Sequence, residues 1–181
     1  MPMRVIGGTA GGLTLKGPPR SGVRPTADRV RESIFEILAA HGCGMGSVLD
    51  LYSGTGAMGI EALSRGADRC DFVEADSRAC EVIRENLTRT RLSDRAKVFP
   101  LTVARALARL AGPYDLVVAD PPYEYDRAEQ DLAAVIEKGL LATEGTLVVE
   151  HSKRKQWPET LAGRPQLLTR RYGDTSVTFY R

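Results

Sequence analysis

The chain has 181 residues, of which 43% are hydrophobic and 27% charged, and its formal net charge is +2 at pH 7. This composition is ordinary for one globular domain that buries a core. No run approaches the roughly 18 apolar residues that a membrane span needs, and the N-terminus lacks an apolar secretory segment, so we expect a cytoplasmic protein without membrane contact.

The cysteines and histidines argue against a disulfide framework or a metal site. The three cysteines form no CxxC pair, and the two histidines lie far apart in the sequence. We therefore expect reduced thiols and no bound metal.

The charge is distributed unevenly along the chain. Residues 1–31 carry six Lys or Arg and one acid, and residues 152–181 carry seven and two. The segment between them carries twelve Lys or Arg against twenty acids. Basic ends around an acidic centre suggest that the ends contact a polyanion, although small imbalances of this kind are also common in proteins without such a partner.

The N-terminal third of the chain begins with an extended segment and a helix. Two short apolar pieces around glycine-rich turns in residues 3–19 predict a β-hairpin or a loose extended arm. Residues 24–42 then change to helical spacing, with Thr26 as the expected N-cap and Gly42 near the end. We expect two parts, a hairpin extension over residues 1–24 and one domain over 25–181.

From about residue 46, short apolar strands alternate with amphipathic helices. The predicted strands are 47–53, 69–75, 96–100, 114–120 and 145–151, and the predicted helices are 57–65, 77–91, 103–110 and 126–139. This alternation predicts a parallel sheet covered on both faces, and residues 166–181 predict a closing antiparallel hairpin. The fold class is therefore α/β, a Rossmann-like, mostly parallel sheet with an antiparallel end and a small N-terminal hairpin.

A glycine-rich loop follows the first strand of this sheet. Gly54, Gly56 and Gly59 fit the G-x-G-x-x-G pattern, and Glu74 lies twenty residues after Gly54. Such a loop allows close approach of a nucleoside cofactor, and an acid at the end of the second strand suits ribose hydroxyls. The same glycines are also compatible with nothing more than a tight turn.

Asp50 decides between cofactors. A carboxylate just before the loop would repel a pyrophosphate, which disfavours a nicotinamide dinucleotide. S-adenosylmethionine has a ribose, no phosphate, and a positively charged sulfonium and ammonium, so Asp50 would favour it. The alternative is that Asp50 only caps a turn.

The fourth strand ends in Asp120-Pro121-Pro122-Tyr123. Two consecutive prolines have fixed φ and no N–H, so their carbonyls are rigid acceptors beside the Asp120 carboxylate. Such a cluster selects a group that only donates hydrogen bonds, such as an exocyclic NH2, and would localise its lone pair toward a methyl donor. Tyr123 can stack on the ring that carries the amine. The alternative is that the prolines simply end the strand.

The motifs "DLYSGTGAMGIEALSRGA", "FVEAD", "VVADPPY" and "VVEHSK" resemble class I amino-methyltransferases. The segments "MRVIGGTAGG", "RPTADRVRESIFEIL" and "RRYGDTSVTFY" resemble one family among them, the bacterial RsmD-type 16S rRNA (guanine-N2)-methyltransferases. The resemblance implies transfer from S-adenosylmethionine, with S-adenosylhomocysteine as product, to a guanine of 16S rRNA in an assembling or assembled small ribosomal subunit. It implies that residues 1–24 form an RNA-contacting extension and residues 25–181 the methyltransferase domain. It also implies that the catalytic loop is Asp120 to Tyr123 and that the cofactor contacts Asp50, Ser53, Gly54, Gly56, Glu74, Thr102 and Thr26. Thr102 stands where many relatives carry an Asp or Asn that meets the adenine amine.

The basic ends fit an RNA partner. The candidate phosphate-binding residues are Arg4, Lys16, Arg24, Arg29 and Arg31, each of which is equally compatible with a solvated surface. We expect a monomer, because no predicted helix shows a spare apolar face.

Three other functions stay open at this point. A DPPY-type methyltransferase can also act on DNA adenine or on a protein glutamine amide, since each offers an NH2 on a planar group. A nicotinamide oxidoreductase would use the same glycine loop, against which Asp50 argues. A non-catalytic ribosome-assembly factor could keep the fold.

Overall fold

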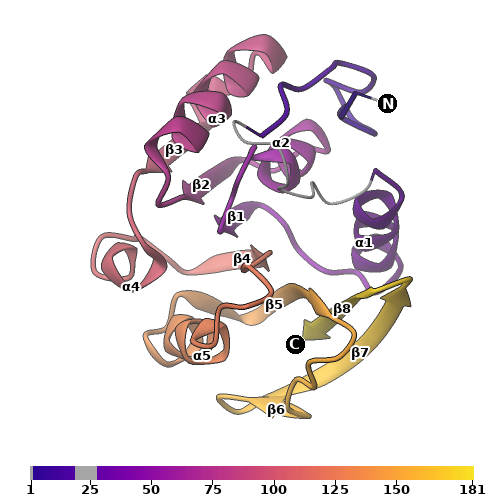
Figure 1. Cartoon of the computed structure of the whole chain (residues 1–181), viewed down its shortest axis with the longest axis vertical. Helices are drawn as coiled ribbons and strands as arrows, with labels where there is room; N and C mark the ends of the chain where they lie inside the picture. The colour runs from indigo at the N-terminus through magenta and orange to yellow at the C-terminus, as the bar shows by residue number, and fades with distance from the viewer. Residues whose placement is uncertain (1, 19–27) are drawn as a thin grey trace.

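The computed structural model describes residues 2–18 and 28–181 (Figure 1). Its helices are α1 (Asp28–Ala40), α2 (Ala57–Ser64), α3 (Ser77–Thr90), η1 (Ser93–Arg95, a 3-10 turn), α4 (Val103–Ala106) and α5 (Ala128–Glu137). Its strands are β1 (Ser47–Leu51), β2 (Arg69–Val73), β3 (Ala96–Phe99), β4 (Tyr114–Ala119), β5 (Leu141–Ser152), β6 (Thr160–Leu161), β7 (Arg164–Tyr172) and β8 (Thr175–Tyr180).

The strands form one sheet in the order β3-β2-β1-β4-β5-β8-β7-β6. The pairs from β3 to β5 are parallel, and β8, β7 and β6 are added antiparallel at the other edge. The chain moves outward from β1 to β3, then returns to place β4 on the other side of β1. In open α/β sheets, the crevice at this reversal, at the carboxyl ends of the strands, is where ligands bind.

Helices cover both faces of the sheet, as the alternation of strands and helices predicts. Ile34 of α1, Ile60 of α2 and Ile83 of α3 belong to one hydrophobic cluster, which packs on one face. Val103 of α4 and Leu132 of α5 belong to the second cluster, on the opposite face (Figure 1). Because both faces are covered, the central strands are buried almost completely, and only their ends are available to a ligand.

The predicted elements are confirmed, with differences at their ends. Strand β5 begins at Leu141, four residues before the predicted start, because Leu141 pairs with Tyr114 of β4. The register of the pairing then shifts between Tyr114 and Leu116. Helix α4 ends at Ala106 instead of residue 110, and the chain continues in tight turns in which the Arg109 and Leu110 amides both donate to the Ala106 carbonyl. The two-residue strand β6 has no apolar run and was not predicted.

The N-terminal hairpin is present and packs into the domain. The Val5 amide donates to the Leu13 carbonyl at 3.0 Å, and the Leu15 amide to the Met3 carbonyl at 2.8 Å. Met3, Val5 and Leu15 are buried in the same cluster as α1, α2 and α3. Residues 3–15 therefore share a hydrophobic core with α1, α2 and α3. The expected N-cap, Thr26, lies outside the described residues.

Candidate active site

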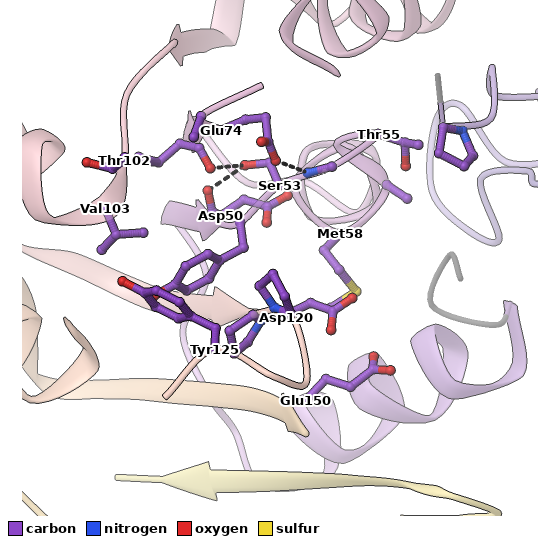
Figure 2. A pocket seen from close by; sticks show the side chains of 18 of the residues that line it. Asp50, Ser53, Thr55, Met58, Glu74, Thr102, Val103, Asp120, Tyr125 and Glu150 are labelled. Atoms are coloured by element: carbon purple, nitrogen blue, oxygen red, sulfur yellow. Dashed lines mark hydrogen bonds between the residues drawn. The ribbon is translucent and has the colours of Figure 1, made fainter. Parts of the chain in front are cut away.

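A cavity of about 720 Å³ opens at the carboxyl ends of the central strands (Figure 2). Its walls come from the ends of β1 and β2, the segment before α4, the loop after β4 and the side of β5. The predicted site residues that line it are Asp50, Ser53, Gly54, Glu74, Thr102, Asp120, Pro121, Pro122 and Tyr123. The reversal of strand order between β1 and β4 thus brings together loops that are up to 70 residues apart in the sequence.

Glu74 connects the glycine loop to the end of β2. Its carboxylate accepts the Gly54 amide on one oxygen and the Asp76 amide on the other, both at 2.8 Å. Ser53 is held by its own loop, because its hydroxyl donates to the Asp50 carbonyl at 2.6 Å. Each Glu74 oxygen keeps a second lone pair, so the carboxylate can accept further hydroxyl donors from the cavity.

The glycines of the motif act mainly on the backbone and on packing. Gly56 does not line the cavity; it precedes α2 with φ of 77°, a conformation that other residues rarely adopt. Gly59 lets α2 approach β2, since a Cβ there would lie 2.4 Å from the Phe72 ring. These two positions explain why the loop can bring its Gly54 amide to the mouth of the cavity.

Asp50 is an almost fully buried carboxyl at the floor of the cavity, 3% exposed. Burial raises the pKa of its side chain from 3.8 to about 8; the nearby Glu74 charge adds to the rise, and the Gly59 amide, which donates to it at 2.9 Å, opposes it. Ionising such a buried acid without a nearby positive charge costs free energy. A cation in the cavity would compensate for that cost.

The loop after β4 presents acceptors and an aromatic ring. The Tyr125 amide donates to the Pro122 carbonyl at 2.9 Å, which closes a turn across the motif. The Tyr123 ring is 46% exposed, while its hydroxyl is hydrogen-bonded to that of Thr175 at 2.7 Å. The ring is thereby tethered at the cavity mouth with one face available for stacking.

Sequence reasoning missed a pair of tyrosines in the wall of the cavity. Tyr52 and Tyr125 meet edge to face, with ring centroids 5.9 Å apart. Both hydroxyls donate to the same oxygen of the buried Asp131, at 2.9 and 2.8 Å. Asp131 lies on α5, so it connects the loop after β1 to the loop after β4. The available signal was an aromatic residue in the loop after each strand: Tyr52 directly follows β1, and Tyr125 comes six residues after the end of β4.

Thr102 lies at the N-terminus of α4, where its hydroxyl accepts the Arg105 amide at 3.4 Å. Its neighbours Leu101 and Val103 also line the cavity and give this wall an apolar character suited to a planar ring. Thr26, the remaining predicted cofactor contact, lies outside the described residues.

The family described as conserved hypothetical protein 95 has a sequence model that matches residues 3–181. The chain belongs to this family. The resemblance drawn from the motifs is thus confirmed at the level of the family.

Relatives of this family member match over most of their length. YlbH of Bacillus subtilis is 36% identical over 182 residues, which cover 99% of this chain and 98% of YlbH. Ribosomal RNA small subunit methyltransferase D of Escherichia coli K12 is 35% identical over 148 residues, which cover 82% of this chain and 74% of that protein. The solved structure of yhhF from Escherichia coli superposes with a TM-score of 0.85 at 31% identity, covering 98% of this chain and 96% of that chain.

The predicted phosphate-binding residues fall into different environments. Arg4 is exposed and lies 3.8 Å from Asp28, and Lys16 is paired with Glu85 at 2.6 Å. Arg29 is exposed on α1, and Arg24 lies outside the described residues. For Arg4, Lys16 and Arg29, which are exposed, phosphate binding remains a proposal.

The prediction for Arg31 is wrong. Its side chain is fully buried, where it lies 3.6 Å from Glu61 and donates to Asp28 at 2.9 Å and to the Arg4 carbonyl. The Glu61 carboxylate also accepts the amides of Ile6 and Gly7 at 2.8 and 2.9 Å. Arg31 therefore joins α1, α2 and the N-terminal hairpin, and it is not available to a phosphate.

Residues 2–18 and 28–181, which the structure describes, offer neither a metal site nor a membrane-spanning helix. They contain no group of three or more His, Cys, Asp or Glu side chains placed to hold a metal ion. None of the helices in this part of the chain is both long and apolar enough to cross a bilayer.

Replacing Asp50 with Asn should raise the stability of the free protein at alkaline pH. Because the pKa of Asp50 is raised in the folded state, wild-type unfolding free energy falls as pH rises from about 4 to about 8. Asn cannot ionise but can still accept the Gly59 amide. Above pH 8, we expect the variant to melt about 2–4 °C higher than wild type, which corresponds to a gain of about 1 kcal/mol in the free energy of unfolding.

The same variant should bind S-adenosylmethionine more weakly, since the neutral amide loses the attraction to a cation. Thermal unfolding at pH 6 and pH 9, with and without S-adenosylmethionine, measures both effects. A variant that melts at the wild-type temperature at both pH values and binds normally would contradict the assigned role of Asp50.

Proposed function

We propose that this protein transfers a methyl group from S-adenosylmethionine to the N2 amine of a guanine in 16S rRNA. The observation that carries the proposal is that the Asp120–Tyr123 loop lines the same cavity as Asp50, Gly54 and Glu74. The hydrogen-bond acceptors of the Asp120–Tyr123 loop, which suit an amine, thus line the same cavity as the groups that suit the cofactor. The relatives named ribosomal RNA small subunit methyltransferase D support the choice of substrate.

The residues present fit S-adenosylmethionine. Glu74 keeps acceptor capacity for the ribose hydroxyls, and the apolar wall at Leu101 and Val103 suits the adenine ring. Asp50 supplies a buried carboxyl that gains from a nearby positive charge. When bound, the sulfonium supplies an electrophilic methyl group and a good leaving group.

The chain itself contributes positioning and charge. Asp120 and the Pro121 carbonyl accept the two amine hydrogens, which directs the nitrogen lone pair toward the methyl group. As the nitrogen forms its new bond it gains positive charge, which the Asp120 carboxylate stabilises. The extra proton leaves through Asp120 or directly to water. Tyr123 stacks on the base and keeps it in line, with its hydroxyl anchored on Thr175.

The base must leave its stacked or paired position before its amine reaches Asp120. Exposed basic residues of the hairpin, α1 and the region of β5 and β7 provide the electrostatic contact to the surrounding phosphates. Arg4 and Arg29 lie on the hairpin and α1, and Lys153, Arg154, Arg170 and Arg171 are exposed on or next to β5 and β7. We propose that the N-terminal hairpin and this basic set contact the rRNA of the small subunit.

The test is transfer from labelled S-adenosylmethionine to small ribosomal subunits from cells that lack this enzyme. Parallel reactions contain naked 16S rRNA, DNA and a protein extract, and Asp120→Ala is the blank. We expect the label in one guanine of the 16S rRNA. Label only in DNA or protein would keep the amine chemistry but refute the substrate, and binding of S-adenosylmethionine without any transfer would favour an assembly factor.

A further inference from the structure

Glu150 is the acid of the "VVEHSK" motif, and the resemblance assigns it no role. It lies on β5, half-buried, and lines the cavity together with Asp120. In the parallel register of β4 and β5, Val118 pairs with Val148 and Ala119 with Val149. Asp120 directly follows β4, and Glu150 is the next residue of β5. Because side chains alternate between the two faces of a sheet, Asp120 lies on the same face as Val118, and Glu150 on the same face as Val148.

The two carboxylates share one end of the cavity. Both also line a small adjacent hollow that includes Met58 and Ile34. Figure 2 shows the Asp120 and Glu150 side chains together at the end of the cavity away from Glu74 and Thr102. A base whose amine donates to Asp120 can therefore turn one of the two edges beside that amine toward Glu150. One of these two is its Watson–Crick edge.

That edge distinguishes guanine from the other amine-bearing bases. In guanine two ring nitrogens lie beside the amine: N1, on the Watson–Crick edge, carries a hydrogen and donates, whereas N3 has a lone pair and accepts. In adenine and cytosine the ring nitrogen beside the amine has a lone pair and only accepts. An ionised carboxylate only accepts, so it pairs with the guanine N1–H and repels the lone pair of the other two bases.

We propose that Glu150 accepts the N1–H of the target guanine and is the residue that makes the site selective for guanine. This inference rests on the proposed function, because it assumes that a base amine occupies the Asp120 clamp. Asp120 then selects an NH2 group, whereas Glu150 selects the base that carries a donor next to it. A site with a dedicated hydrogen-bond partner discriminates strongly against an analogue that cannot satisfy it.

The test compares guanine with 2-aminopurine, which keeps the N2 amine but has an acceptor at N1. The guanine labelled in the transfer experiment above is replaced by 2-aminopurine in ligated 16S rRNA, which is then assembled into subunits. Mapping that guanine first separates a failure of the proposed function from a failure of this inference. The measured quantity is the ratio of kcat/KM for the two substrates.

Wild type should prefer guanine by at least about tenfold. Glu150→Gln can donate its amide hydrogens to the acceptor N1, so the preference should disappear or reverse. Glu144→Gln, the same change at an exposed position of β5, should keep the wild-type preference. Binding of S-adenosylhomocysteine checks that each variant is folded.

Equal rates on both substrates for wild type would overturn the proposal, as would a Glu150→Gln variant that keeps the wild-type ratio. Should Glu150→Gln fail to fold, Glu150→Asp replaces it. That variant keeps an acceptor, so guanine must remain the better substrate, although at a lower rate. A preference of Glu150→Asp for 2-aminopurine would refute the role of the carboxylate.

Discussion

Asp120→Ala should lose methyl transfer by at least about a thousandfold while binding S-adenosylmethionine nearly as well as wild type. The alanine removes the acceptor for one amine hydrogen and the negative charge that stabilises the developing cation, and loss of one such group typically costs about 10²–10³ in rate. The additional loss of base positioning increases the effect. Glu74, which we assign to the cofactor, is held by the Gly54 and Asp76 amides, and these contacts are expected to persist in the variant.

Asp120→Asn is the matched variant. Its amide oxygen can still accept one amine hydrogen, so the base remains positioned, but the negative charge is gone. We expect a rate between those of wild type and Asp120→Ala. Single-turnover transfer to small subunits measures the chemical step, and calorimetry with S-adenosylhomocysteine measures cofactor binding. A fully active Asp120→Ala would remove the amine clamp from the mechanism.

The position of this loop could be predicted from the sequence because it depends on a simple rule. Parallel strands present their carboxyl ends at one edge of the sheet, so residues that end different strands meet there. Asp50 near the end of β1, Glu74 after β2 and Asp120 after β4 follow this rule, although 70 residues separate the first from the last. The alternation of apolar strands and amphipathic helices was enough to locate all three.

Contacts that depend on strand order could not be predicted in the same way. Glu150 lies beside Asp120 only because β5 pairs with β4, and its side chain faces the cavity because of their register. Asp131 reaches Tyr52 across 79 positions, through the packing of α5 on the sheet. Neither arrangement leaves a local pattern in the sequence, since each partner alone resembles an ordinary surface acid or a core tyrosine.

Arg31 is different, because a local signal was present. It lies three and four residues before Ile34 and Phe35, both buried, so helical periodicity places it on the inner face of α1. Its charge suggested an RNA contact, whereas its position indicated burial. Its partner Glu61 lies on α2, within the glycine-loop motif, where the sequence gives no reason to expect a buried carboxylate.

Glu74→Ala should weaken S-adenosylmethionine binding by about 1–3 kcal/mol, which is roughly five- to 150-fold. Two effects contribute. The variant loses the acceptor for the ribose hydroxyls, and it releases the Gly54 and Asp76 amides that the carboxylate now holds. Glu81→Ala, which removes the same charge from an exposed position of α3, is the control and should bind normally.

The two effects can be separated by the ligand. Calorimetry with S-adenosylhomocysteine measures both, whereas an analogue without the 2′ and 3′ hydroxyls senses only the loosened loop. If Glu74 accepts the ribose, the variant should be strongly impaired toward the natural ligand and much less toward the analogue. Equal losses for the two ligands would mean that Glu74 acts only by holding Gly54 in place, and the ribose acceptor would then have to come from another side chain of the cavity. Unchanged affinity for both would place the ribose away from β2 altogether.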